Sequence, residues 1–382
     1  MTTMIECIFT SINNGYLPKA RILAASVRRH HPEAKMALML SDHKDPALDY
    51  SDFDIVLTPE DVVEGVGDLQ SWLFDHTVVE LCTAVKPFAF SHLFKQYGFA
   101  NVVYQDPDTV LYARMEELEQ QMVTHPIILT PHVSVPAVDT DDLHDGEMLG
   151  CLRHGVFNLG FLALTRVGEG PAFLQWWQDR CRDYCFDDNQ RGLFTDQKWV
   201  DLAPCFFQTL GIMRVPSYNV ATWNLYYRQV STRADGTIVV NGSHPLRFYH
   251  FSGFDIGTHE HMLGKHDAGN ATLLEMTRWY SSELERLKNP AGLPDKYGVF
   301  ANGRKIPADW RRYYRSQPAL KRMIPHPYDQ YEAVIAHFDS APDEIALNPS
   351  YSALERFVRR SPGLASLVRA VVPASVIRRL RG

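Results

Sequence analysis

The stretch Val102-Val103-Tyr104-Gln105-Asp106-Pro107-Asp108-Thr109-Val110-Leu111 joins two apolar runs through two aspartates spaced two residues apart. The first run predicts a buried strand over 101–105, and Pro107 predicts a turn after it. Carboxylates beside a buried strand are costly unless something compensates their charge. Two of them at a strand end suit a hard divalent cation, Mg²⁺ or Mn²⁺, which would in turn hold a diphosphate.

The segments on both sides of this stretch alternate between strand and helix patterns, which predicts an α/β fold built on a Rossmann-like nucleotide-binding sheet. Strands are predicted over 4–11, 35–40, 53–57, 101–105, 126–130, 155–165 and 246–252. Helices are predicted over 18–29, 77–97, 115–123, 170–185 and 195–203, and a long loop over 132–153. Beyond about residue 265 the pattern predicts a mainly helical extension. We therefore expect a catalytic domain over 1–265 and a helical, basic region over 266–382.

The composition predicts a globular protein that does not bind nucleic acid. The chain has 382 residues, 45% of them apolar, and a net charge of −7, so it can bury a large core and has no overall basic character. Residues 353–382 nevertheless carry seven arginines and one acid. This asymmetry predicts either a basic segment on an anionic membrane surface or a helical subdomain packed on the rest of the chain.

The cysteines and the apolar runs bear on location. The six cysteines form no Cys-x-x-Cys pair, which predicts free thiols in a reducing cytoplasm. The first residues predict a strand and not a signal peptide, and no run of about 18 apolar residues occurs. We expect a cytoplasmic protein, either free or at the inner face of the plasma membrane.

Further polar residues interrupt apolar segments, and each has a structural alternative. His250 closes an apolar strand, where a histidine is usually structural, although it could also be a third metal ligand beside two carboxylates. Asn158 either contacts a sugar hydroxyl or satisfies a neighbouring loop. Asp196 either caps a helix or belongs to the functional site. Lys86 either faces solvent or neutralises a phosphate.

Taken in order, these motifs resemble the GT-A fold glycosyltransferases of the glycogenin-like and lipopolysaccharide-galactosyltransferase-like type. The resemblance covers about residues 4–255. It rests on six elements: Phe9-Thr10-Ser11 with Tyr16, Lys86, Asp106-Pro107-Asp108, Phe157-Asn158-Leu159-Gly160, Thr195-Asp196-Gln197 and His250-Phe251-Ser252-Gly253. After Gly253 the family often carries Lys-Pro-Trp, where this chain has Phe254-Asp255-Ile256, and Lys265 is the nearest basic residue.

The resemblance implies a metal-dependent transfer of a sugar, with retention, from a nucleotide-diphosphate sugar such as a UDP-sugar to a glycan or lipid-linked acceptor. It implies that Asp106, Asp108 and His250 bind Mn²⁺ or Mg²⁺, and that Asp196 and Gln197 lie beneath the anomeric carbon. The donor would be contacted by Thr10, Ser11, Tyr16, Lys86, Asn158 and Lys265. Synthesis of a bacterial cell-envelope polysaccharide or glycolipid is the expected setting.

Two other functions fit part of the same pattern. Asp106-Pro107-Asp108-Thr109-Val110 also matches the opening of haloacid-dehalogenase-type phosphatases, in which Asp106 would be the nucleophile. That motif normally follows the first strand of its domain, whereas here about a hundred residues precede it. A GT-A-like protein that binds a sugar or partner without turnover is the second alternative.

Overall fold

The computed structural model describes residues 3–136, 142–290 and 295–340. Two compact units make up the chain, one formed by residues 1–66 and 78–295 and the other by 67–77 and 296–382. All the predicted site residues belong to the first unit. The predicted division into a catalytic domain over 1–265 and a helical region over 266–382 stays a prediction, because these compact units do not show which residues take part in catalysis. The basic segment 353–382, for which we predicted a membrane surface or a packed subdomain, lies outside the described residues.

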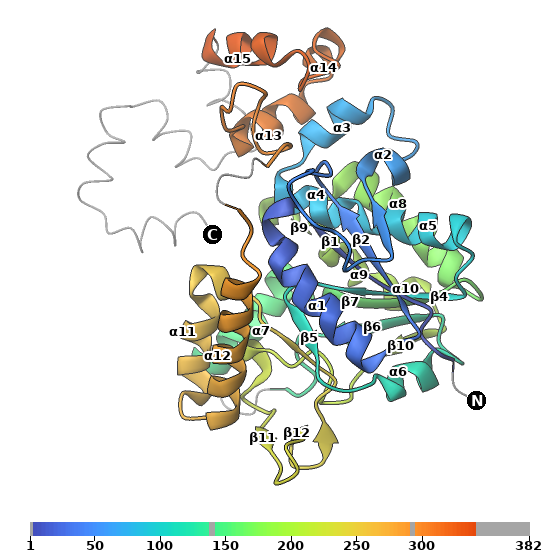
Figure 1. The fold of residues 1–382 in the computed structure, drawn as a ribbon. Helices are drawn as coiled ribbons and strands as arrows, with labels where there is room; N and C mark the ends of the chain where they lie inside the picture. The colour runs from blue at the N-terminus through green and yellow to red at the C-terminus, as the bar shows by residue number, and fades with distance from the viewer. Residues whose placement is uncertain (1–2, 137–141, 291–294, 341–382) are drawn as a thin grey trace. The chain divides into compact units, whose positions relative to one another are not determined.

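A seven-stranded, mainly parallel sheet forms the centre of the first unit, with the strand order β10-β6-β7-β4-β1-β2-β3 (Figure 1). Its strands are β1 (Cys7–Ile12), β2 (Lys35–Leu40), β3 (Ile55–Leu57), β4 (Asn101–Gln105), β6 (Ile127–Pro131), β7 (Phe157–Thr165) and β10 (Leu210–Ile212). Only β7 runs against its neighbours, β4 and β6. The predicted α/β fold is therefore confirmed.

The sheet is buried on both faces because its central strands are apolar at consecutive positions. Ile8 joins the apolar cluster of Leu23 and Val27 on one face. The next residue, Phe9, points to the other face, where its ring lies 4.8 Å from that of Phe90. This alternation, with a period of two residues, is what a strand covered on both sides requires.

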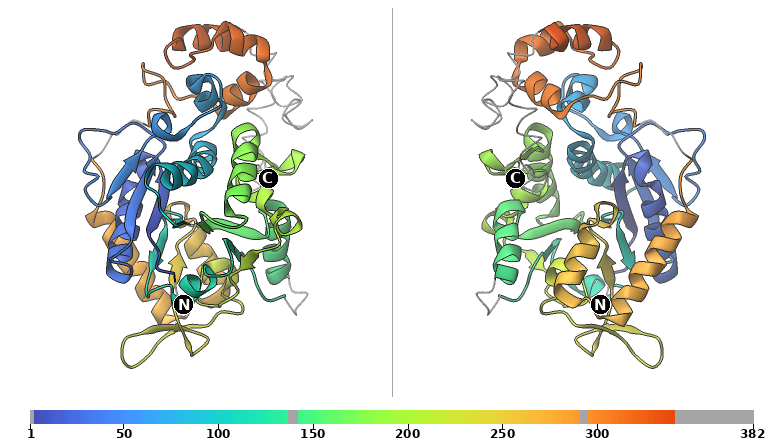
Figure 2. Two further views of the ribbon diagram at one scale, coloured as in Figure 1. Left: turned by 90° about the vertical axis from the view of Figure 1, so that its right-hand side faces the viewer. Right: turned by 90° about the vertical axis from the view of Figure 1, so that its left-hand side faces the viewer.

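Helices cover both faces of the sheet (Figure 1). The helices of the first unit are α1 (Leu17–His30), α2 (Pro59–Val62), α4 (Val78–Ala84), α5 (Lys86–Gln96), α6 (Glu116–Gln121), α7 (Asp142–His154), α8 (Gly170–Tyr184), α9 (Gln197–Val200), α10 (Ala203–Phe206), α11 (Thr258–Asp267) and α12 (Ala271–Arg286). Figure 2 shows α12 beside α1, while α5 and α8 pack together on the other side of the sheet.

One edge of the sheet gathers the polar residues that the motifs contain. Strands β1, β4 and β6 all end there, and β7 begins there because it is antiparallel, with Phe157 paired to Pro131. Asn158 therefore lies at the same edge as the residues that follow Gln105. In open α/β sheets, ligands bind outside the carboxyl ends of the strands.

A two-stranded ladder outside the main sheet completes this edge. Strand β5 (Thr109–Leu111) pairs antiparallel with β14 (Phe248–His250), and His250 lies opposite Thr109. The N–H of Phe251 also donates to the carbonyl oxygen of Asp108, over 2.8 Å. The ladder thus brings His250 to the aspartate pair although about 140 residues separate them in sequence.

Smaller strands complete the first unit. Strands β11 (Val230–Thr232), β12 (Ile238–Val240) and β13 (His244–Pro245) form a three-stranded sheet, and β8 (Asp187–Asp188) pairs with β9 (Leu193–Phe194). Four 3₁₀ turns, at Asn14–Tyr16 (η1), Asn189–Arg191 (η2), Thr222–Asn224 (η3) and Phe254–Ile256 (η4), connect elements of the described chain.

The second unit is helical where it is described. It contains α3 (Leu69–Asp75), α13 (Ala308–Ser316), α14 (Pro318–Met323) and α15 (Tyr331–Ser340). Phe74 and Tyr314 pack in its aromatic core, and Lys321 forms an ion pair with Asp75. The predicted mainly helical C-terminal extension is confirmed for the described residues.

Three predicted elements differ from the structure. Predicted helix 77–97 is divided between α4 and α5, because Pro87 in the first turn of α5 offers no N–H to the preceding turn. Predicted helix 195–203 is replaced by the short helices α9 and α10, with Pro204 in the first turn of α10. The predicted loop 132–153 contains α7, whose charged first residues resemble a solvated loop in sequence. Among the described helices, none is both long and apolar enough to span a membrane.

Candidate metal centre

Asp106, Asp108 and His250 come together at the carboxyl edge of the sheet. Each offers a ligand atom, and these atoms lie within 4.8 Å of one another. His250 Nε2 lies 3.0 Å from Asp108 Oδ1 and 3.8 Å from Asp106 Oδ2. Two carboxylate oxygens and one imidazole nitrogen are ligands that Mn²⁺ and Mg²⁺ sites use, so the donor set fits the predicted cation.

The turn between β4 and β5 orients the first aspartate. The backbone N–H of Asp106 donates to the carbonyl oxygen of Gly160 over 2.8 Å, and the N–H of Thr109 donates to the carbonyl oxygen of Asp106 over 3.0 Å. The hydroxyl of Tyr104 donates to Asp106 Oδ1 over 2.6 Å. Because Oδ1 is held in this way, Oδ2 is left to face Asp108 and His250.

Electrostatics tie Asp108 to His250. Burial alone would raise the pKa of the Asp108 carboxyl, but the nearby imidazole outweighs it and lowers that pKa. Burial alone would lower the pKa of His250, yet Asp108 and Asp106 together raise it. Each group therefore stabilises the charged form of the other. A cation bound here would replace the proton of His250, so metal binding and protonation would compete.

Glycine at position 160 allows Asp106, Asn158 and His250 to approach its backbone closely. A Cβ atom on Gly160 would lie 2.6 Å from His250 Cε1, 2.7 Å from Asn158 Oδ1 and 2.8 Å from Asp106 Oδ2. Non-bonded carbon atoms pack best at about 3.5–4.0 Å, so a side chain here would displace Asp106, Asn158 or His250. The glycine is required by close approach, since its φ is not positive.

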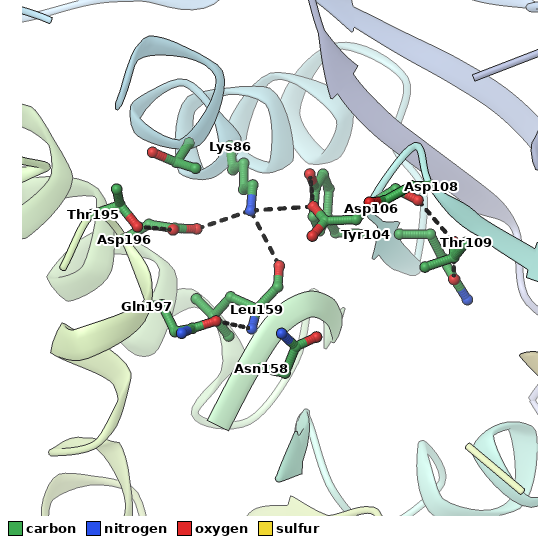
Figure 3. Close-up of polar contacts among 12 residues, drawn as sticks. Lys86, Tyr104, Asp106, Asp108, Thr109, Asn158, Leu159, Thr195, Asp196 and Gln197 are labelled. Atoms are coloured by element: carbon green, nitrogen blue, oxygen red, sulfur yellow. Dashed lines mark hydrogen bonds and ion pairs between the residues drawn. The ribbon is translucent and has the colours of Figure 1, made fainter. Parts of the chain in front are cut away.

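Lys86 connects the aspartate turn to the segment before α9 (Figure 3). Its Nζ lies 3.1 Å from Asp196 Oδ2 and 3.7 Å from Asp106 Oδ1, and it donates to the carbonyl oxygen of Leu159 over 3.1 Å. Burial lowers the pKa of Lys86, but Asp196 and Asp106 together outweigh this and raise it. The lysine is therefore a buried, charged partner of two acids and not a solvent-exposed side chain.

Asp196 and Gln197 lie beside this lysine, and both are buried. Asp196 precedes the first residue of α9 without capping it through its side chain; it pairs with Lys86 instead. The carboxamide of Gln197 is held at both ends, because its oxygen accepts from the N–H of Leu159 over 2.9 Å and its nitrogen donates to the carbonyl oxygen of His154 over 3.0 Å. Gln197 thus fixes the start of β7 at the site edge.

The remaining predicted donor contacts come from several elements. Thr10 and Ser11 lie near the end of β1, and their buried hydroxyl oxygens have no hydrogen-bond partner. Leaving such a hydroxyl without a partner costs about 1–3 kcal/mol, and a polar ligand at this strand end could bond to either one. Tyr16 is half exposed in η1, with Lys19 Nζ 4.5 Å from its ring centre. Lys265 on α11 forms an ion pair with Glu147 of α7, with its Nζ 3.5 Å from Glu147 Oε1.

Two residues at this edge were missed by the sequence prediction. Tyr104 was counted only as part of a buried strand, although the polar residue two positions later gives its hydroxyl a partner. Asn219, fully buried, bonds to both Asn158 and His250. The one sequence signal for Asn219 is an amide between Tyr218 and Val220 in an otherwise buried segment.

A second group of possible ligands, formed by His31, Glu33 and Glu119, does not have the chemistry of a metal site. His31 Nε2 accepts the backbone N–H of Met115 over 3.0 Å, so a neutral His31 carries its proton on Nδ1. Nδ1 is the atom that lies 3.8 Å from each carboxylate, and a protonated nitrogen cannot bind a metal. Arg114 already compensates both acids at 2.5 Å.

Two proteins of Bacillus subtilis (strain 168) are similar to this chain in sequence. The uncharacterised protein YfnF is 27% identical over 210 residues, which cover 54% of this chain and 68% of YfnF. The uncharacterised protein YfnD is 26% identical over 187 residues, which cover 48% of this chain and 57% of YfnD. No protein-family model matches the chain.

Several solved glycosyltransferase structures resemble the chain at low similarity. The galactosyltransferase LgtC is 12% identical, with 77% of this chain and 99% of that chain covered and a TM-score of 0.39. Mouse xyloside xylosyltransferase 1 is 12% identical, with 66% and 98% covered and a TM-score of 0.36. GlyE of Streptococcus pneumoniae is 13% identical, with 78% and 67% covered and a TM-score of 0.37. Similarity at this level does not indicate what the chain does, so its function has to be inferred from the residues of the site.

Gly160→Ala tests whether the folded protein requires a residue without a side chain at position 160. Because the added methyl group would overlap three site residues, we expect a loss of about 1–3 kcal/mol in the free energy of unfolding, measured by urea denaturation. Gly264→Ala is the control: a Cβ there meets nothing within 4 Å, and in helix α11 the change should raise stability by up to about 1 kcal/mol. A Gly160→Ala variant as stable as the unmodified protein would contradict the close approach.

His31 should make the protein sensitive to acid. Burial lowers its pKa from 6.5 to about 4, so the unfolded chain binds this proton more readily than the folded one. The stability that His31 contributes is complete above pH 6.5 and is lost as the pH falls toward 4. Between pH 7 and pH 5, the unmodified protein should lose about 2 kcal/mol more free energy of unfolding than His31→Gln. Urea denaturation at both pH values measures this, and equal losses would show that His31 is protonated when folded.

Proposed function

We propose that the chain is a GT-A glycosyltransferase that moves a sugar, with retention, from a nucleotide-diphosphate sugar to a glycan or glycolipid acceptor. A UDP-sugar is the favoured donor and Mn²⁺ or Mg²⁺ the favoured cation. One observation supports this most. One connected network of contacts joins motif residues that are distributed over 165 residues of sequence. These residues are Lys86, Asp106, Asp108, Asn158, Asp196, Gln197 and His250.

The proposed cation would be held by Asp106 Oδ2, Asp108 Oδ1 and His250 Nε2, the atoms that face one another at the edge of the sheet. When bound, it supplies positive charge that stabilises the diphosphate as a leaving group. Lys86 keeps Asp106 and Asp196 in place and contributes a buried positive charge near the same oxygens. Thr10 and Ser11 offer hydroxyls for the nucleotide at the neighbouring strand end.

In the proposed transfer, the bond between the anomeric carbon and the diphosphate oxygen breaks, and the diphosphate leaves with the electron pair. The acceptor hydroxyl oxygen forms the new bond to the anomeric carbon, and its proton passes to the departing phosphate oxygen. Gln197 does not accept this proton, because its carboxamide oxygen is a weak base and already accepts the Leu159 N–H. The proposed role of Gln197 is to present the fixed dipole of its carboxamide beneath the sugar and to hold the start of β7 in place.

Asp108→Asn tests the metal-dependent reaction. Removing one negative ligand should reduce Mn²⁺-dependent release of UDP from UDP-sugars by at least about 100-fold, while the circular dichroism spectrum and thermal midpoint stay close to those of the unmodified protein. Asp188→Asn is the matched control, since the side chain of Asp188 is 14% exposed and that of Asp108 16%, and Asp188 lies outside the network.

The outcomes of this experiment separate the alternatives. Undiminished metal-dependent transfer by Asp108→Asn would contradict the proposed site. Release of phosphate from simple phosphate esters, without UDP from any UDP-sugar, would favour the phosphatase in which Asp106 is the nucleophile. Binding of UDP and Mn²⁺ with no turnover on long incubation would favour the non-catalytic protein.

We also propose that residues 353–382 bring the enzyme to an anionic membrane surface, where a lipid-linked acceptor of cell-envelope synthesis would be found. The support is charge, seven arginines against one acid, and such segments gain about 1 kcal/mol per basic residue near an anionic leaflet. Replacing Arg378, Arg379 and Arg381 by glutamine should weaken sedimentation with phosphatidylserine vesicles at least tenfold and leave UDP release unchanged. Equal sedimentation of both proteins would contradict the membrane role.

A further inference from the structure

Asn219 lies in the segment between β10 and η3, fully buried, with a left-handed φ of 52°. An L-residue other than glycine pays about 1–2 kcal/mol for this conformation, and asparagine tolerates it best. The backbone is fixed from two sides, because its carbonyl oxygen accepts from Arg228 Nη1 over 3.0 Å and from Asn224 Nδ2 over 2.9 Å. The fixed backbone of Asn219 gives its side chain a defined orientation.

The side chain of Asn219 bonds at both ends inside the candidate site. Its Oδ1 lies 3.2 Å from His250 Nδ1, and its Nδ2 donates to Asn158 Oδ1 over 3.1 Å. Backbone pairing supports the same placement, because the N–H of His250 donates to the carbonyl oxygen of Val220 over 2.8 Å. Asn219 therefore touches the imidazole of His250 on the side away from the two aspartates.

The hydrogen bonds of this group run in one direction. With Asn219 Nδ2 donating to Asn158, Asn219 Oδ1 can only accept, so His250 Nδ1 must carry a proton. Asn158 Nδ2 continues the chain toward His132 Nε2, 3.2 Å away. A neutral His250 with its proton on Nδ1 has its lone pair on Nε2, the atom that faces Asp106 and Asp108.

We propose that Asn219 is a positioning residue that fixes the tautomer and ring orientation of His250, so that Nε2 is presented to the cation. The inference rests on the metal role of His250 in the proposed function. Partners of this kind commonly change metal affinity 10–100-fold. Because Asn219 also holds Asn158, it links the third ligand to the residue expected to contact the sugar or phosphates.

Nitrogen-15 NMR of the metal-free protein, labelled at histidine, tests the tautomer without any need for activity. The spectrum is recorded at alkaline pH, where the imidazole is neutral, and the His250 signals are assigned with His250→Gln. We expect a larger share of the Nδ1-protonated tautomer in the unmodified protein than in Asn219→Gly, because Asn219 Oδ1 accepts from Nδ1 while Asp108 Oδ1 competes for a proton on Nε2. Equal shares of the two tautomers in both proteins would overturn the role of Asn219.

Two substitutions distinguish the effect of the hydrogen bond on metal affinity from an effect on folding. Asn219→Gly keeps the left-handed backbone without strain and removes the acceptor, so Mn²⁺ affinity, followed by electron paramagnetic resonance of the free ion, should fall 10–100-fold. Asn219→Asp keeps an oxygen for His250 Nδ1 and should stay within about threefold of the unmodified protein. Asn241→Gly is the control, since Asn241 has nearly the same φ of 51° and is exposed at a turn away from the site.

The outcomes distinguish this inference from the proposed function. Equal Mn²⁺ affinity in Asn219→Gly and the unmodified protein would overturn the positioning role while leaving the metal site intact. An unmodified protein that binds no Mn²⁺, alone or with UDP, would overturn the proposed function and with it the reason for fixing His250. Loss of affinity in Asn241→Gly as well would show that the effect is a general loss of stability and would also count against Asn219.

Discussion

The candidate site depends on the pairing of β5 with β14. This ladder has three residue pairs. It places His250, from near the end of the first unit, with its Nε2 3.0 Å from Asp108 Oδ1. Phe248 in the same strand is buried in the apolar cluster that also contains Ile8 and Val103, so the ladder is fastened to the core of the main sheet. The position of His250 is therefore set by apolar burial, and the polar geometry follows from it.

Around that point the acids outnumber the basic side chains that contact them, and Lys19 acts on Asp108 only from further away. Three buried or partly buried acids, Asp106, Asp108 and Asp196, have Lys86 and His250 as their contacting basic partners. His250 neutralises the aspartate pair only when it is protonated. A divalent cation in its place would satisfy both carboxylates at once, and Gly160 leaves room for it by having no side chain. The same excess of negative charge explains why a phosphate ligand would require the cation first.

Much of the fold and the first two ligands could be predicted from the sequence because their signals are local. An apolar run that ends in two carboxylates around Pro107 predicts a strand, a turn and a cation site within ten residues. Lys86 and Asp196 could be proposed as polar residues in apolar surroundings, but not as partners, because 110 residues separate them. Asn219 had only a weak local signal, an amide between Tyr218 and Val220, because its role arises only when β14 and the segment after β10 lie side by side. Helix α7 was mistaken for a loop because its first turn is rich in acids, a feature that helix starts and solvated loops share.

Asp106, Asp108 and His250 are proposed to hold a cation together, and that cation would activate a nucleotide-sugar. The most direct test of this proposal is the release of nucleoside diphosphate from a panel of nucleotide-sugars by the purified full chain, with Mn²⁺ and after chelation by EDTA. We expect at least one donor, with a UDP-sugar favoured, to be turned over with Mn²⁺. Chelation should abolish the reaction and added Mn²⁺ should restore it, whereas turnover at the same rate in EDTA would rule out a cation at this site.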